Sequence, residues 1–149
     1  MAGRKMVYRG STNGTSPIYK RVPVNINQTI YKGSIVVKTT NKASAAGDAA
    51  ATGTVWGVSV EDIVTTGTVT AADTILIDTN PASIYDMPFF STGTKTSFMD
   101  SDIGTMFDLK GDAYTLDPDD TTGGFLEVSD HNNARLTVAV LIHNRVQNA

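Results

Sequence analysis

Apolar and polar residues alternate over short stretches of this chain, most clearly near the C-terminus, in residues 135–143. An extended strand places alternate residues on opposite faces. One face of this segment is fully apolar and consists of Leu136, Val138, Val140 and Ile142. The other is partly apolar and consists of Thr137, Ala139, Leu141 and His143. Two such faces suit a central strand, or a strand covered by a neighbouring subunit.

Similar short segments recur along the chain and are separated by Gly, Asp, Asn and Pro residues that favour turns. The predicted strands are Ile18–Val24, Gly33–Thr39, Thr54–Val60, Thr74–Thr79, Ser83–Phe89, Thr105–Leu109, Ala113–Leu116, Gly124–Ser129 and Arg135–His143. Many short strands with turns between them are typical of an all-β sandwich or small barrel. The stretch from His131 to Asn133 is predicted to be the turn before the last strand, because Asn tolerates positive φ.

Two further segments carry local predictions. Within Thr54–Val60, alternation places Trp56, Val58 and Val60 on one face. Gly57 lies on the opposite face, where another backbone could approach closely. The Ala-rich segment Lys42–Ala51 suggests a helix, but it is short and contains Gly47 and Asp48, so a loop or a single turn is predicted.

The first 17 residues are predicted to form an extended basic arm, and residues 18–149 a single β domain. The run from Gly10 to Pro17 consists of Gly, Ser, Thr, Asn and Pro, which rarely continue a regular element. No internal repeat and no Gly- or Pro-rich linker suggests a second domain. A chain of 149 residues is long enough for one adequate core.

Composition excludes several classes of protein. There is no Cys, so disulfides, thiolate metal sites and thiol catalysis are excluded. No stretch approaches the ~20 apolar residues of a membrane helix. The N-terminal residues lack the apolar run of a secretory signal. These features predict a soluble protein that is synthesised in a reducing cytoplasm and does not bind a membrane.

Charge is distributed very unevenly along the chain. Residues 1–46 contain eight of the 12 Lys and Arg residues and none of the 15 Asp and Glu residues. Such asymmetry indicates a basic segment that meets an acidic surface, belonging to another copy, to another protein or, less readily, to nucleic acid. Nucleic acid is disfavoured because the acidic remainder of the chain would repel it. The predicted partner-binding residues are Arg4, Lys5, Arg9, Lys20 and Arg21.

Catalytic patterns are weak. Ser129, Asp130 and His131 supply the residue types of a catalytic triad, but neighbours in a strand point to opposite faces, so adjacency cannot build a proton relay. His143 is predicted to be a packed or interfacial side chain. Neither a P-loop nor a G-x-G-x-x-G pattern is present. The chain is therefore predicted not to be an enzyme and to need no cofactor.

Two acidic clusters offer oxygen ligands that calcium prefers. They are Asp117, Asp119 and Asp120 in one stretch, and Asp100 with Asp102 in the other. Neither fits the spacing of an EF-hand loop. Solvated turns are the favoured interpretation, and calcium binding remains the alternative.

Three stretches together resemble the small capsid decoration, or cement, proteins of tailed bacteriophages. They are Tyr31–Gly67, with its GVSV strand after a loop; Thr74–Phe89, TILIDTNPASIYDMPF; and Asp102–His143, with IG, FDL and the closing VAVLIH. The likeness covers most of the chain beyond Gly33 and consists of strand and turn patterns.

The resemblance implies a β-barrel or β-tulip-like sandwich subunit, present as a homotrimer on the outer capsid surface of the virion. Its partners would be the major capsid protein and its own copies, and the family offers no catalytic residues. One alternative is a carbohydrate-binding or adhesive β-module of a virion fibre or cell surface, although the context of Trp56 is that of a core residue. A hydrolase that uses Asp117 and Asp120 is a third hypothesis.

Overall fold

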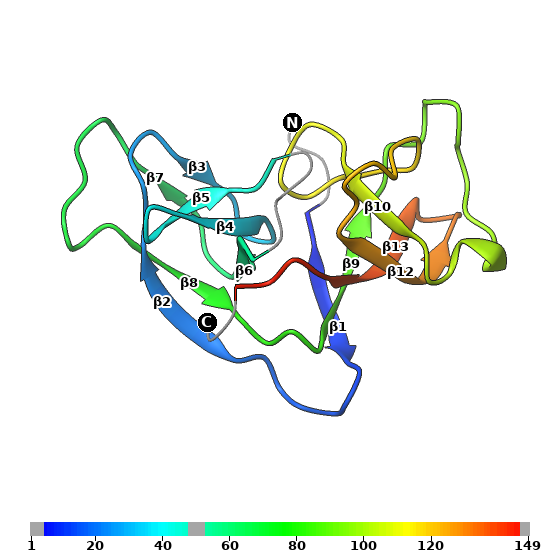
Figure 1. Ribbon diagram of the computed structural model, residues 1–149, viewed down its shortest axis with the longest axis horizontal. Helices are drawn as coiled ribbons and strands as arrows, with labels where there is room; N and C mark the ends of the chain where they lie inside the picture. Colours follow the sequence, from blue (N-terminus) through cyan, green and yellow to red (C-terminus); the bar gives the residue numbers. More distant parts are fainter. Residues whose placement is uncertain (1–4, 48–52, 147–149) are drawn as a thin grey trace.

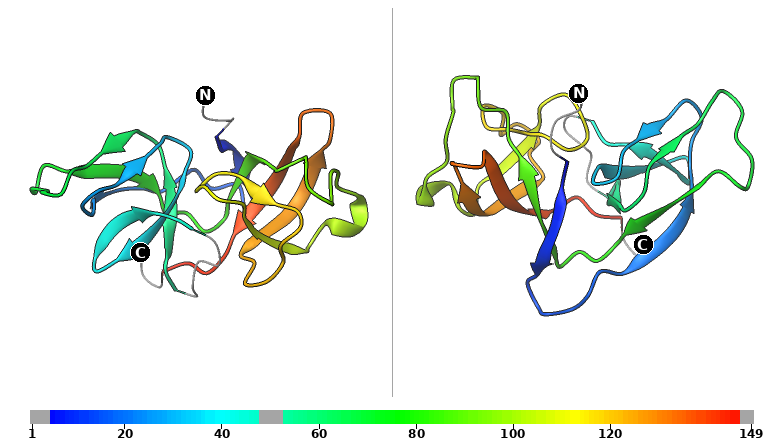
Figure 2. Two further views of the ribbon diagram at one scale, coloured as in Figure 1. Left: turned by 90° about the horizontal axis from the view of Figure 1, so that it is seen from above. Right: turned by 180° about the vertical axis from the view of Figure 1, so that it is seen from behind.

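The computed structural model describes residues 5–47 and 53–146. In these residues it contains β-strands in three antiparallel sheets and one short 3-10 helix, η1 (Asp100–Asp102). The larger two sheets lie side by side (Figures 1 and 2). Within residues 5–47 and 53–146, a helix that could span a bilayer is absent.

The first sheet has six strands, ordered β1-β9-β13-β12-β10-β11. They are β1 (Val7–Ser11), β9 (Ser83–Pro88), β13 (Thr137–Ile142), β12 (Leu126–Asn132), β10 (Met106–Leu109) and β11 (Leu116–Asp117). The second sheet has five strands, ordered β2-β8-β6-β4-β5. They are β2 (Tyr19–Pro23), β8 (Thr74–Asp78), β6 (Val55–Ser59), β4 (Ile35–Thr39) and β5 (Lys42–Ala45). A two-stranded sheet joins β3 (Thr29–Ile30) to β7 (Ile63–Val64).

The all-β class with antiparallel strands is confirmed, and the arrangement is consistent with a small sandwich. In each main sheet the first and last strands do not pair with one another, so neither sheet closes into a barrel within the described parts of the chain. β13 lies between β9 and β12, as the two apolar faces of this segment suggested for a central strand.

Apolar side chains form two hydrophobic cores on opposite faces of the five-stranded sheet. The larger core joins the two main sheets and includes Ile35, Val55, Val58, Tyr85, Met87, Phe89, Phe98, Phe107, Leu109, Leu116, Phe125, Leu126, Val128, Val138, Val140 and Ile142. The smaller one consists of Val22, Val24, Ile30, Val36, Ala43, Trp56, Ile75 and Ile77. Because the middle of the five-stranded sheet is covered on both faces, its central strand β6 is buried at every position.

A β-bulge at Trp56 explains how β6 serves both cores. Val36 pairs with Gly57 and Val37 pairs with Val55, which leaves Trp56 opposite no residue. Trp56 therefore belongs to the smaller core and Val58 to the larger one. The prediction that Trp56 and Val58 share a face is wrong, because the extra residue reverses the alternation at that point.

Gly57 confirms the predicted close approach of two backbones. A Cβ at this position would overlap the carbonyl oxygen of Asp78 in the neighbouring strand β8. The side chain of Asp78 is 1% exposed. Its Oδ2 accepts hydrogen bonds from the hydroxyls of Ser83 at 2.7 Å and Tyr85 at 2.6 Å. These bonds satisfy a buried carboxylate at the junction between β8 and β9.

The C-terminal segment joins the two main sheets. After β13 the chain crosses to β6, where Val55 donates to the carbonyl of Asn144 and receives a bond from the N–H of Val146 (Figure 1). Between these residues, the guanidinium of Arg145 donates to the carbonyls of Ile142 and Asn80, each at 3.2 Å. Burial lowers the pKa of Arg145, and the Asp78 carboxylate opposes that shift.

The predicted N-terminal arm is wrong for Val7–Ser11. These residues are β1, an edge strand of the six-stranded sheet that pairs with β9. Met6 is 5% exposed and belongs to the larger core. A register shift between Tyr8 and Gly10 absorbs one residue, so the small residues after it continue the pairing. Edge pairing needs only backbone groups, and composition alone does not reveal it.

The predicted loop at Lys42–Ala51 is also wrong in part. Lys42–Ala45 is β5, which pairs with β4, and residues 48–51 lie outside the described residues. Thr40 and Asn41 both have positive φ, 49° and 63°, which is the geometry of a two-residue type I′ hairpin turn. A β-branched Thr is uncommon in that turn, which explains why the hairpin was missed.

The last strand begins later than predicted. β12 continues through His131 to Asn132, and the turn occupies residues 133–136. Leu136 has a φ of 56° and is 44% exposed, so it does not extend the apolar face of β13. Val138, Val140 and Ile142 are buried in the larger core, as predicted from their alternation. The predicted strand Ala113–Leu116 is wrong except at Leu116, which with Asp117 forms the short strand β11.

Candidate partner-binding surface

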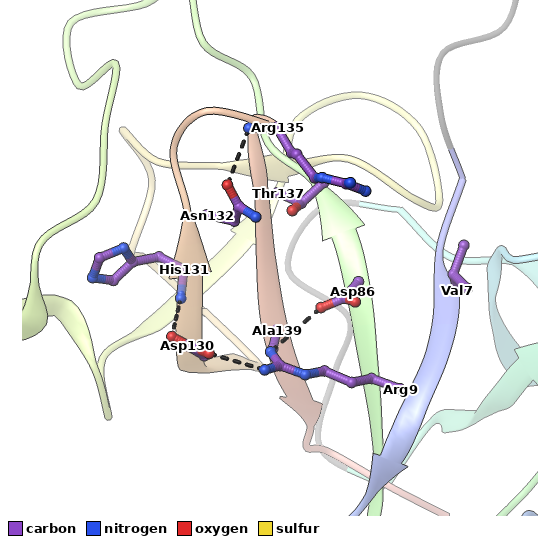
Figure 3. Close-up of a pocket in the computed structure, with 9 residues that line it drawn as sticks. All are labelled: Val7, Arg9, Asp86, Asp130, His131, Asn132, Arg135, Thr137 and Ala139. Carbon is purple, nitrogen blue, oxygen red and sulfur yellow. Dashed lines mark hydrogen bonds and ion pairs between the residues drawn. The ribbon is translucent and has the colours of Figure 1, made fainter.

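The outer face of the six-stranded sheet is hollowed into an open groove of about 560 Å³ (Figure 3). Residues from β1, β9, β13, β12 and the turn after β12 line this groove: Val7, Arg9, Asp86, Asp130, His131, Asn132, Arg135, Thr137 and Ala139. We call it the sheet-face groove. Its floor is formed by the small buried residues Thr137 and Ala139, 7% and 2% exposed.

Arg9 spans the groove from the edge strand β1 (Figure 3). Its guanidinium lies 3.0 Å from the carboxylate of Asp130 on β12 and 3.6 Å from that of Asp86 on β9. β1 has a bulge at Arg9 and β12 has a bulge at Ser129, and each bulge leaves one residue of its strand unpaired. Bulges change the direction in which nearby side chains point. A second hollow of about 420 Å³ also contains Arg9 and Asp130 in its lining.

The ion pair helps to lower the pKa of Asp130. The backbone N–H of His131 and the Arg9 guanidinium together hold the pKa of Asp130 below its ordinary value of 3.8. Both side chains are about half exposed, 46% for Arg9 and 52% for Asp130, so solvent screens the pair. Such a pair contributes at most about 1 kcal/mol to folding, and it can exchange partners at an interface.

Arg135 adds a second guanidinium to the rim. Its backbone N–H donates to Asn132, which closes the turn between β12 and β13. Its side chain forms no ion pair with any carboxylate of residues 5–47 and 53–146. The groove therefore offers one paired and one unpaired guanidinium beside two carboxylates, which suits a polar protein surface.

The structure separates the predicted partner-binding residues onto two sheet edges. Arg4 lies outside the described residues. Lys5 lies just before the edge strand β1, and Arg9 lies in it. Lys20 and Arg21 belong to β2, at the edge of the other sheet. No single basic patch contains them all. The prediction that they bind a partner remains untested.

Each of the four described residues has a partner within the chain. Arg21 pairs with Glu61 at 2.8 Å, and this bond lowers the pKa of Glu61 below its ordinary value of 4.5. The ammonium of Lys5 lies 4.8 Å from the ring centre of Tyr31, and that of Lys20 lies 5.8 Å from that of Trp56. Through Arg9 and Arg21, the basic segment meets acidic residues of its own chain.

Ser129, Asp130 and His131 do not form a relay. The Ser129 hydroxyl donates to the carbonyl of Ala139 at 3.2 Å. His131 contacts the carboxylate of Asp100 through Nε2 at 3.0 Å, and its ring points away from the groove in Figure 3. His143 is also engaged by a carboxylate, with its Nε2 2.8 Å from Glu127.

The carboxylates of the two acidic clusters hold turns together. Asp119 accepts the backbone N–H groups of Thr94 and Lys95 at 2.9 and 2.7 Å. Partial burial would raise the pKa of Asp102, but the Met99 N–H and the Lys95 ammonium, 3.0 Å away, lower it below 3.8. Among the described residues, no group of three or more His, Cys, Asp or Glu side chains is placed to hold a metal ion.

Sequence reasoning missed Asp86 and Arg135 as groove residues. Asp86 occupies the outward-facing position between Ile84 and Pro88 on β9, so its exposure follows from alternation. Its proximity to Arg9 depends on the pairing of β1 with β9, which no local pattern reveals.

Comparisons of the chain with protein-family models, with curated proteins and with solved structures give no match.

Proposed function

We propose that the protein is a non-enzymatic structural component of a virion. It binds the outer surface of a phage head and stabilises it by clamping neighbouring major capsid protein subunits. The observation that carries this proposal is the form of the sheet-face groove. It is open, spans four strands and is lined by both signs of charge, as polar protein interfaces commonly are.

A cement protein works by adding contact area between subunits that already touch. Many weak contacts that engage together on one lattice raise the effective affinity without any single strong contact. Half-exposed ion pairs such as Arg9 with Asp130 suit this task, because each costs little to break and re-form across an interface. The unpaired guanidinium of Arg135 is available for a carboxylate on the capsid.

The identity of the partners rests on the resemblance of Tyr31–Gly67, Thr74–Phe89 and Asp102–His143 to phage decoration proteins. It supports a homotrimer on the outer capsid surface, made in the host cytoplasm before it joins the particle. Its partners are the major capsid protein and other copies of this chain. Nucleic acid, membranes and cofactors have no part in the proposal.

The alternative, a carbohydrate-binding or adhesive β-module, has one observation in its favour. Tyr8, Tyr19 and Tyr31 are 39%, 57% and 43% exposed, and exposed aromatic rings can stack on sugars. Trp56 is only 4% exposed and cannot serve in this way without rearrangement. Binding to a glycan array by the isolated protein would favour this alternative.

The test compares heads that carry the protein with heads that lack it. We expect decorated heads to resist heating or low-salt rupture at conditions that break bare heads. Arg135→Ala is expected to weaken this protection, whereas Lys110→Ala, outside the sheet-face groove, is expected to preserve it. Equal rupture of bare and decorated heads would contradict a cement function.

A further inference from the structure

The face of the five-stranded sheet that carries the smaller core also carries two lysines beside one tryptophan. The ammonium of Lys20 on β2 lies 5.8 Å from the ring centre of Trp56, and that of Lys38 on β4 lies 5.2 Å from it. Period-two alternation places Lys20 beside the core residue Val22 and Lys38 beside Val36, so both lysines share the face of the smaller core. We call this group the Lys20–Lys38 site.

The polar groups of this site lack conventional partners. Neither ammonium forms an ion pair with a carboxylate in residues 5–47 and 53–146. Trp56 is 4% exposed, yet its indole Nε1 is buried without a hydrogen-bond acceptor. A buried indole N–H usually finds a partner, and leaving a buried donor unsatisfied destabilises the folded state. Two cations and one unsatisfied donor therefore lie within one small region.

An oxygen anion supplies what all three groups lack. A carboxylate between the lysines would accept charge-assisted hydrogen bonds from both ammoniums. The indole Nε1 of Trp56, which is buried without an acceptor, would gain one if the anion displaced the lysines from the ring and reached it. Two cations suffice for one carboxylate, whereas proteins that bind nucleic acid through its backbone neutralise many phosphates at once, roughly 6–10 in a representative case. The net charge of −3 also repels a long polyanion such as nucleic acid more strongly than a short acidic segment.

We propose that the Lys20–Lys38 site binds a carboxylate side chain in an acidic segment of a partner protein. The inference deepens the proposed function, since that partner would be a protein on the surface of the head. The sequence predicted that Lys20 binds a partner, and the structure adds Lys38 and Trp56 to the same candidate site. Arg21, the neighbour of Lys20 on β2, lies outside the site because it is already paired with Glu61.

Trp56 is the only Trp in the chain, so its fluorescence reports on this site without labelling. The probe is a hexaglutamate peptide, titrated into the intact protein at low ionic strength. We expect a saturable change in Trp56 emission that weakens as salt is added. Lys20→Ala and Lys38→Ala are each expected to weaken binding about tenfold, the loss of one charge-assisted hydrogen bond. Lys110→Ala, which removes one positive charge from the turn after β10, where the ammonium lies 4.6 Å from the ring centre of Phe90, is the matched control and is expected to bind as the unmodified chain does.

Three results would overturn the inference: no change in emission, equal affinity in the Lys20→Ala/Lys38→Ala double variant, or tighter binding of inorganic phosphate or oligothymidylate than of hexaglutamate. Melting curves of the variants establish that each one is folded.

Binding to heads separates this inference from the proposed function. If hexaglutamate binds but heads do not, the site stands and the decoration function fails. If heads bind the double variant as well as the unmodified chain, the function stands and this site is not the contact.

Discussion

At the scale of single residues, Gly57 has the least tolerance for a side chain. Even a methyl group there would overlap the carbonyl oxygen of Asp78, a backbone atom that cannot move without displacing β8. Gly57→Ala is therefore expected to lower the free energy of unfolding by about 1–3 kcal/mol or more. Gly111→Ala is the control, since a Cβ at that position meets no atom within 4 Å. Urea denaturation measures both, and equal stability of the two variants would show that β6 and β8 are not this close.

Tyr85 gives a prediction about alkaline pH. Burial, and next the hydrogen bond to the Asp78 carboxylate, raise the pKa of this phenol above its ordinary value of 10.0. A pKa raised in the folded state contributes stability that is fully present below the unfolded pKa and is lost as pH rises above it. We expect Tyr85→Phe to lose about 1–3 kcal/mol at neutral pH, because the buried carboxylate loses a donor.

The same variant should also lose less stability than the unmodified chain between neutral pH and strongly alkaline pH. Tyr8→Phe is the control, because Tyr8 is 39% exposed and its hydroxyl makes only a long contact, 3.5 Å, with the carbonyl of Thr15. Thermal melts across the alkaline range measure both effects. A steeper alkaline loss in Tyr85→Phe would contradict the assigned role of the phenol.

At the scale of elements, β13 is expected to be highly sensitive to an introduced charge, because five of its six residues are buried. Val138 is 1% exposed in the larger core, so Val138→Asp places a carboxylate where it loses hydration without gaining a partner. The expected cost is several kcal/mol, comparable with much of the ~5–15 kcal/mol that stabilises a domain. Val64→Asp makes the same change on β7 at a residue that is 72% exposed, and it should cost little. Similar melting temperatures for the two variants would mean that β13 is not a core strand.

The edge strand β1 yields a second prediction at this scale. Its pairing with β9 covers one side of the strand that carries Tyr85 and Met87. Deletion of residues 1–17 is therefore expected to lower the melting temperature, whereas a truncation that begins at Lys5 keeps all of β1. Circular dichroism melts of the two truncations test this. An unchanged melting temperature after the longer deletion would show that residues 1–17 form an arm outside the fold.

Alternation predicted the longer strands because burial on one or both faces leaves a period of two in the sequence. β3 and β7 are two residues long and carry no measurable period. The bulge at Trp56 reverses the alternation, and the hairpin at Thr40 and Asn41 uses backbone angles that its residues do not announce. The charge pattern predicted a role for Arg9. Its contact with Asp130 could not be predicted, because β9 and β13 lie between β1 and β12 and the contact depends on the strand order of the whole sheet.

At the scale of the whole molecule, folding rearranges the charge asymmetry of the sequence. Arg9 and Arg21, from the basic segment, pair with Asp130 and Glu61, so part of the predicted attraction is satisfied within the subunit. The cations left without carboxylate partners among the described residues include Lys20 and Lys38 on the five-stranded sheet and Arg135 in the turn between β12 and β13 of the six-stranded sheet. A subunit with cations on two surfaces can contact two neighbours at once, which is what clamping adjacent capsid proteins requires.

Sedimentation of the protein with and without purified empty heads tests the central proposal most directly. Alone, the protein should sediment as a homotrimer. With heads, it should co-sediment in a saturable ratio, and Arg135→Ala should reduce the bound fraction at elevated salt because screening weakens the contacts that remain. A protein that stays in the supernatant at every head concentration, under conditions where it is folded, would contradict a decoration function.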